Sequence, residues 1–69
     1  MAITLERAKK LQYHEVLIHK KTGKRWYVNG KVRTWKRDEN RIEIPVKHGL
    51  YAYDTVTADL LEEMDLERP

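Results

Sequence analysis

The sequence has no cysteine and no serine among its 69 residues, and only three glycines and two prolines. Without cysteine there is no disulfide and no cysteine-based zinc site, and without serine there is no serine nucleophile. No apolar run approaches the ~20 residues that a membrane-spanning helix needs. Residues 1–10 lack the apolar core of a signal peptide. We therefore expect a soluble, cytoplasmic protein that makes no contact with a membrane.

Few other residues are candidates for chemistry. His14 and His19 point to opposite faces if they lie on one strand, so they do not chelate an ion together, and His48 is the remaining histidine. The Thr-Gly-Lys segment at residues 22–24 lacks the upstream glycine and the Lys-Ser/Thr ending of a phosphate loop. The sequence therefore predicts no catalytic residue, no metal ligand and no cofactor, and we do not expect an enzyme.

The net charge of +3 is unevenly distributed. Residues 19–37 hold eight of the fourteen Lys and Arg residues, both tryptophans, and no Asp or Glu. Residues 54–69 hold six acidic residues and one basic residue, Arg68. This asymmetry predicts a dipolar molecule. The acidic segment is compatible with a solvated helix face, with repulsion of nucleic acid, or with folding back onto the basic segment.

Residues 1–69 are expected to form one small domain in three parts. Residues 1–12 form a helical N-terminal segment, because apolar residues recur at helical spacing after Thr4, a suitable N-cap. Residues 54–69 form an acidic C-terminal helix and tail with Thr57 as its N-cap. The predicted buried stripe of that helix is Leu60, Leu61 and Met64.

The middle part, residues 13–53, has the β-branched residues and turn signals of short strands. In residues 41–46, Ile42, Ile44 and Val46 alternate with polar residues, and Pro45 indicates a strand edge or end. Five strands in about forty residues indicate a mainly β fold, a small, strongly bent, SH3-like barrel with short helices at both ends. The five predicted strands are residues 13–20, 25–28, 31–36, 41–46 and 50–53.

Asn29-Gly30 lies in the middle of the basic segment and is a strong signal for a two-residue β-hairpin turn. Pairing through this turn sets Trp26 beside Arg33 and Trp35 beside Lys24, with both tryptophans outward among cations. The opposite face, centred on Tyr27 and Val32, is then predicted to be buried. The outward face consists of Lys24, Trp26, Val28, Lys31, Arg33 and Trp35.

A cationic hairpin that carries aromatic rings suits an anionic polymer, because bases stack on the rings while Lys and Arg bind phosphates. The first hypothesis is a non-enzymatic, weakly sequence-specific nucleic-acid-binding module. A β-bulge that flips the register would instead bury a tryptophan in the core. The predicted contact residues are Lys20, Lys21, Lys24, Arg25, Trp26, Lys31, Arg33, Trp35, Lys36 and Arg37.

Two nearby segments, NGK-x-x-TWK at residues 29–36 and P-x-K-x-GLY at residues 45–51, form a wider pattern with Arg41. The pattern resembles one found in short reading frames of phage and prophage type. The resemblance covers about twenty-five residues and implies no activity, but it implies a virus- or mobile-element-encoded protein that acts in a host cytoplasm. In this pattern Gly49 is expected to adopt positive φ and Leu50 to return to the core.

The second hypothesis is a protein-interaction or virion-assembly module, since a small SH3-like domain binds peptides on an aromatic groove or adds a strand at an edge. Its acidic C-terminal helix would dock on a basic partner, including a second copy of the chain. The sequence leaves open whether the partner is DNA, RNA or protein. The contacts of this module are predicted to be Tyr51, Tyr53, Trp26 and Trp35.

Overall fold

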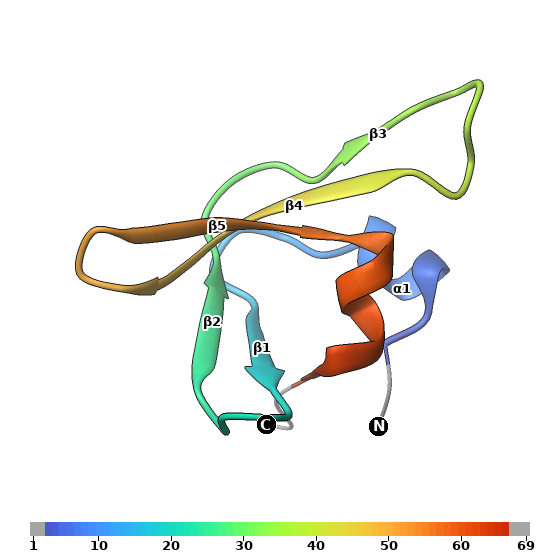
Figure 1. Ribbon diagram of the computed structural model, residues 1–69. Helices are drawn as coiled ribbons and strands as arrows, with labels where there is room; N and C mark the ends of the chain where they lie inside the picture. The colour runs from blue at the N-terminus through green and yellow to red at the C-terminus, as the bar shows by residue number, and fades with distance from the viewer. Residues whose placement is uncertain (1–2, 67–69) are drawn as a thin grey trace.

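The computed structural model describes residues 3–66 and is mainly β, as the sequence predicts. Six strands form one antiparallel sheet, accompanied by a short α-helix and a short 3-10 helix (Figure 1). The elements are α1 (Leu5–Lys9), β1 (Val16–His19), β2 (Arg25–Val28), β3 (Arg33–Thr34), β4 (Ile42–Gly49), β5 (Ala52–Thr57), η1 (Ala58–Glu63) and β6 (Met64–Leu66).

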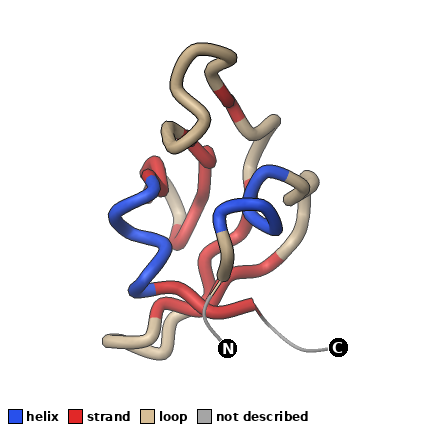
Figure 2. The backbone as a smooth tube through the Cα atoms, turned by 90° about the vertical axis from the view of Figure 1, so that its right-hand side faces the viewer, coloured by secondary structure: helices blue, strands red, loops and turns tan. Residues whose placement is uncertain are grey.

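The strands lie in the order β3-β4-β2-β1-β6, and β5 pairs with the other edge of β4. Within residues 3–66 the sheet does not close on itself, so the bent sheet is established but the barrel is not. The long loop between β3 and β4 rises above the two helices (Figure 2). The β1–β2 turn, at the opposite end of the molecule, has Gly23 at φ +71°, a backbone conformation that glycine adopts without strain.

The predicted Asn29-Gly30 hairpin is wrong. Strand β2 pairs with β1 and β4, and β3 pairs with β4 alone, so β2 and β3 lie end to end along one edge of β4. Neither Asn29 nor Gly30 has the positive φ that a type I′ turn requires. The link of residues 29–32 instead bulges opposite Pro45, whose carbonyl accepts a 2.8 Å hydrogen bond from the Asn29 N–H.

Pro45 explains why the pairing is interrupted there. Proline has no N–H to donate to a neighbouring strand. Val28 pairs with Val46 and Arg33 with Glu43, so the four link residues face only two residues of β4. A Cβ added to Gly30 would lie 3.1 Å from Pro45 Cγ, and glycine therefore suits this close approach.

The core is made by one face of the sheet and by both helices. The alternation of β4 is confirmed, because Ile42, Ile44 and Val46 are all buried. Tyr27, predicted to be core, points away from it and is 46% exposed. The other buried apolar residues are Ile3, Ala8, Leu11, Leu17, Val28, Val56, Leu61 and Met64.

The N-terminal helix begins as predicted. The Thr4 hydroxyl accepts a 3.2 Å hydrogen bond from the Arg7 N–H, which satisfies one of the free donors at the helix start. The helix ends at Lys9, earlier than expected, and Ala8 and Leu11 anchor this segment to the core.

The C-terminal part differs from the prediction. Asp54 and Thr57 belong to β5, residues 58–63 form a 3-10 helix instead of an α-helix, and residues 64–66 form a strand paired with β1. Thr57 lies at the N-cap but makes no side-chain capping bond. Residues 67–69 of the predicted tail lie outside the described residues.

The β4–β5 turn also differs from the expectation. Tyr51 has positive φ, at 65°, whereas Gly49 does not. Leu50 does not return to the core, because it stands at the hairpin tip with 79% of its surface exposed.

Candidate nucleic-acid interface

Two of the segments that carry the predicted cations, the β1–β2 turn and the loop between β3 and β4, lie at opposite ends of the molecule (Figure 1). Lys20, Lys21 and Lys24 belong to the β1–β2 turn, whereas Lys36 and Arg37 lie on the loop between β3 and β4. This separation follows from the wrong hairpin, since β2 and β3 run end to end and not side by side. A single ligand strand therefore does not meet all of these cations on one face.

Two lysines of the β1–β2 turn are engaged within the protein. Lys21 Nζ lies 3.1 Å from Glu63 Oε1, and Lys20 Nζ donates a 3.0 Å hydrogen bond to the Glu62 carbonyl. The hydrogen bond from Lys21 holds the pKa of Glu63 below its usual value. The Lys21–Glu63 pair neutralises part of the charge that the sequence assigned to phosphate binding, and the carbonyl contact takes up one of the Lys20 donors.

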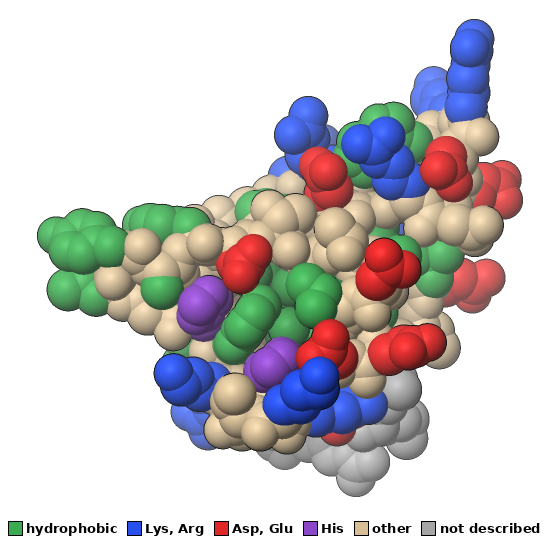
Figure 3. All heavy atoms as spheres, in the orientation of Figure 1, with side chains coloured by type: hydrophobic (Ala, Val, Ile, Leu, Met, Phe, Trp, Pro, Cys, Tyr) green, Lys and Arg blue, Asp and Glu red, His purple; other side chains and the backbone are tan. Residues whose placement is uncertain are grey.

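Trp26 is not part of an outward platform. It lies on the same side of β2 as the buried Val28 and opposite Leu17 of β1. Its ring is stacked between His19, at 5.0 Å between centroids, and His48, at 4.3 Å. Two histidine side chains border a hydrophobic patch in the space-filling view (Figure 3). Because both ring faces are covered, a base has no face of Trp26 to stack on.

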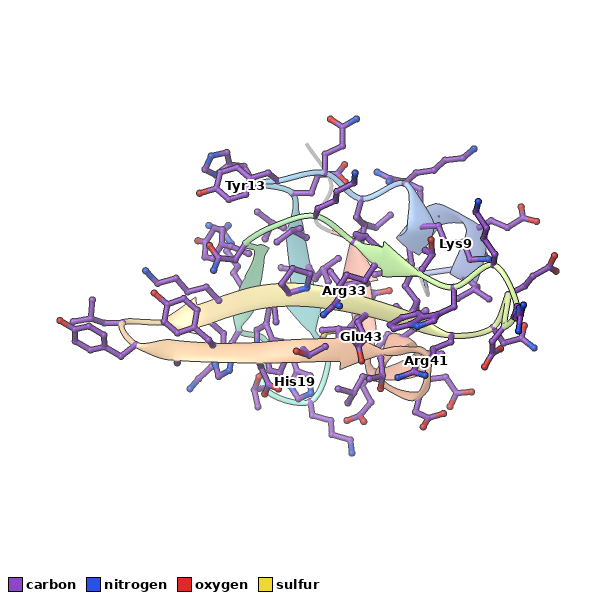
Figure 4. All side chains as sticks on the ribbon, turned by 90° about the horizontal axis from the view of Figure 1, so that it is seen from above. Lys9, Tyr13, His19, Arg33, Arg41 and Glu43 are labelled. Atoms are coloured by element: carbon purple, nitrogen blue, oxygen red, sulfur yellow. The ribbon has the colours of Figure 1, made fainter. Side chains whose placement is uncertain are left out.

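Trp35 does not pair with Lys24, because β3 pairs only with β4. The guanidinium of Arg41 covers one face of its ring at 4.1 Å, a cation–π contact. Glu43 lies between two cations, 3.9 Å from Arg33 and 4.0 Å from Arg41, and the three residues lie together in the view from above (Figure 4). This cluster orients Arg33 on the outside of the sheet.

The outside of the sheet carries exposed tyrosines that the sequence analysis did not assign to this interface. Register places Tyr27 opposite Lys47, and Lys47 opposite Tyr53, in one row across β2, β4 and β5. Tyr27 is 46% exposed, Tyr53 is 60% exposed, and Lys47 Nζ lies 5.5 Å from the Tyr53 ring centroid. Arg33 of β3 pairs with Glu43, which lies on the same face of β4 as Lys47 because alternate residues of a strand share a face, so Arg33 lies on this face too. We call these four residues the outer sheet face.

Beside the link of residues 29–32 lies a groove of about 550 Å³. Its wall is the segment from α1 to Tyr13, which is seen from above beside the chain that leads to Arg33 (Figure 4). Three lysines and an exposed tyrosine line it, and none of its lining residues is acidic. The lining residues are Lys9, Lys10, Leu11, Gln12, Tyr13, Gly30, Lys31 and Val32. We call this the lysine groove.

Glu15 fixes the wall of the lysine groove. Its carboxylate accepts a 2.9 Å hydrogen bond from Arg7 Nη2 and a 2.8 Å bond from the Gln12 N–H. The hydrogen bond from Arg7 is the main reason that the pKa of Glu15 is lowered, against the opposing effect of burial. The His14 N–H donates to the Val28 carbonyl at 3.0 Å, which joins the wall to β2.

The tip of the β4–β5 hairpin is the most exposed apolar part of the described chain. Tyr51 is 84% exposed beside Leu50, and hydrophobic side chains gather at the end of this hairpin (Figure 3). Tyrosine at positive φ is strained, by about 1–2 kcal/mol for a residue with a Cβ. The tip therefore presents two large side chains at a cost to the fold.

Within residues 3–66, no cluster of three or more His, Cys, Asp or Glu could hold a metal ion. None of the helices in this part of the chain is long and apolar enough to cross a bilayer. Comparisons with protein-family models, with curated proteins and with solved structures returned no match. A functional conclusion therefore rests on the residues of the chain itself.

Proposed function

We propose that this protein is a non-enzymatic nucleic-acid-binding module that uses the outer sheet face. The observation that carries the proposal is the row of Tyr27, Lys47 and Tyr53 across three strands. Exposed aromatic rings stack on bases, while neighbouring cations bind phosphates. Both tyrosine rings are exposed, whereas Trp26 has both faces covered, so the tyrosines take the stacking role first expected of tryptophan.

Binding of this kind is mostly electrostatic and weakly sequence-specific. Stacking accepts every base because each has a π-face, and lysine binds phosphate as a point charge. Arg33, although 3.9 Å from Glu43, lies on the same face and adds a guanidinium that suits phosphate.

An SH3-like barrel is part of the same proposal. A 3-10 helix before a last strand that pairs back with β1 supports this architecture. Action in a host cytoplasm, for a protein encoded by a phage-type element, rests on the sequence resemblance alone.

The test is fluorescence anisotropy with labelled single- and double-stranded DNA and RNA over a salt series. We expect saturable binding that weakens as salt rises. Tyr53→Ala should lower the affinity by about 1–3 kcal/mol, the usual value of one stacked base. Tyr51→Ala is the matched control, because Tyr51 is also an exposed tyrosine of the same hairpin but lies at the tip. Wild-type protein that binds none of the four polymers at low salt would refute the proposal.

A second candidate is favoured by the hairpin tip. Leu50 and Tyr51 form an exposed apolar end that fits a protein partner, and Tyr53 lies next to it along β5. The partner in this candidate is a second copy of this chain, joined through the charge asymmetry with the tip in the contact. The mass from light scattering should then be higher at low salt than at high salt. Tyr51→Ala should have a lower mass than the wild type at low salt. A constant monomer mass up to about millimolar concentration would exclude this self-association.

A further inference from the structure

The lysine groove has the size and charge of a ligand site. Its volume of about 550 Å³ lies within the range of about 300–1,000 Å³ that small-molecule sites occupy. Lys9, Lys10 and Lys31 are the ionisable groups that line it apart from the Tyr13 phenol. With three cations and no acid at its surface, the groove favours a ligand that carries negative charge.

The rest of the lining favours a ligand that also has a flat, apolar part. Leu11 is buried and Val32 packs against the core, so both give the groove an apolar base. Tyr13 is 56% exposed and lines the groove, and its ring meets the His14 ring in an edge arrangement at 3.7 Å between centroids. A phosphate joined to an aromatic base meets both requirements, because the base stacks on the ring while lysines bind the phosphate.

The groove is held in shape before any ligand binds. The carboxylate of Glu15 ties Arg7 and the Gln12 backbone together, and the His14 N–H bonds to β2. A wall that is already ordered loses little conformational entropy on binding.

The groove also adjoins the outer sheet face. Gly30 lines the groove and approaches Pro45, and Pro45 lies between Glu43 and Lys47 on β4. The link of residues 29–32 therefore borders both the groove and β4, the strand that carries Lys47. A strand that crosses the row can continue over the link into the groove.

We infer that the lysine groove takes one nucleotide of a single strand, with its base against Tyr13 and its phosphates among Lys9, Lys10 and Lys31. The inference rests on the proposed nucleic-acid binding and adds a further stacking position, which strengthens the preference for single strands. In a duplex the base is paired and stacked, so it reaches such a pocket only after unpairing. The groove therefore separates single-stranded from double-stranded ligands.

The test compares labelled oligothymidine with a labelled hairpin duplex by fluorescence anisotropy. Tyr13→Ala should weaken oligothymidine binding roughly five- to 150-fold, the range for one stacked base, and leave duplex binding unchanged. Tyr13→Phe keeps the ring and should bind oligothymidine as the wild type does. Because Tyr13 is more than half exposed, neither change removes core packing. Thermal unfolding checks that both variants are folded.

A second pair of variants tests the lysines. Lys31→Gln should reduce the slope of log affinity against log salt for oligothymidine by about 0.7, the value of one phosphate contact on a single strand. Lys24→Gln makes the same change of charge in the distant β1–β2 turn and should leave the slope as it was.

The outcomes separate the two proposals. Unchanged oligothymidine affinity in Tyr13→Ala overturns the groove site and leaves the outer sheet face standing. Equal weakening of oligothymidine and duplex overturns the single-strand preference. Wild-type protein that binds neither ligand at low salt overturns the proposed function, and the groove inference with it.

Discussion

Replacing Glu15 by glutamine should destabilise the protein at neutral pH and much less in acid. The substitution keeps the shape of the side chain but removes the charge that accepts bonds from Arg7, at 2.9 Å, and from the Gln12 N–H, at 2.8 Å. In a fully buried site, each hydrogen bond to a charged group would contribute about 1.5–3 kcal/mol to the free energy of unfolding. Both side chains of the ion pair remain more than a third exposed, so solvent screening reduces the expected loss to about 1 kcal/mol in total.

The pH dependence follows from the lowered pKa of Glu15. Hydrogen bonding from Arg7 lowers this pKa below its ordinary value of 4.5, so the unfolded chain takes up a proton more readily than the folded chain. The stabilisation is therefore complete above pH 4.5 and is lost as the pH falls through the folded-state pKa. The difference between Glu15→Gln and wild type should disappear at low pH for this reason.

Thermal unfolding measures this difference directly. A loss of 1 kcal/mol corresponds to a fall of about 4–8 °C in the midpoint for a domain of this size. Glu39→Gln is the control, because it removes the same charge from an exposed position in the loop between β3 and β4. The same midpoint loss at pH 7 and at the lowest pH at which the protein stays folded would refute the reasoning, because the stabilisation is lost as the Glu15 carboxylate takes up a proton below its lowered pKa. An equal loss of the unfolding midpoint in Glu39→Gln would also refute the reasoning.

Two further predictions concern the hairpin tip and the stacked tryptophan. Tyr51→Asn should raise the free energy of unfolding by about 0.5–1 kcal/mol, because asparagine tolerates the positive φ of 65° and little packing is lost; a lower unfolding midpoint would contradict this. In a Trp35→Phe background, removing either stacked histidine should make Trp26 emission more sensitive to acrylamide quenching, because one face of the Trp26 ring is then open to solvent. His48→Ala should increase the quenching more than His19→Ala, since the His48 ring is nearer, and quenching that neither variant changes would contradict the stack.

Local features of the sequence were sufficient for several elements. The Thr4 cap and the alternation of Ile42, Ile44 and Val46 depend only on neighbouring residues and on a single buried face, and both are present as predicted. The mainly β class follows from the same alternation and from the short spacing between turns. Helix ends and the 3-10 character of residues 58–63 were not predicted, because the C-terminal segment is ordered by β6 pairing with β1.

The wrong hairpin shows the limit of local signals. Asn29-Gly30 has the composition of a two-residue turn, but β2 is more stable between β1 and β4, where Val28 is buried opposite Val46. Pro45, sixteen residues later in the chain than Asn29, sets the place where the pairing is interrupted. Such a partner is not visible in the sequence around the turn.

The prediction of the candidate site from the sequence was limited in the same way. The distribution of residues indicated a basic and aromatic surface, because residues 19–37 hold eight Lys and Arg residues, both tryptophans and no acidic residue. Which rings are exposed was decided by register: Trp26 and Tyr27 are neighbours, and successive residues of a strand point to opposite faces. Because one pairing was wrong, the sequence predicted an exposed Trp26 and a buried Tyr27, the reverse of what the structure shows. The sequence determined the kind of surface, and only the tertiary structure decided that Tyr27, Lys47 and Tyr53 form it, because residues of three strands meet there.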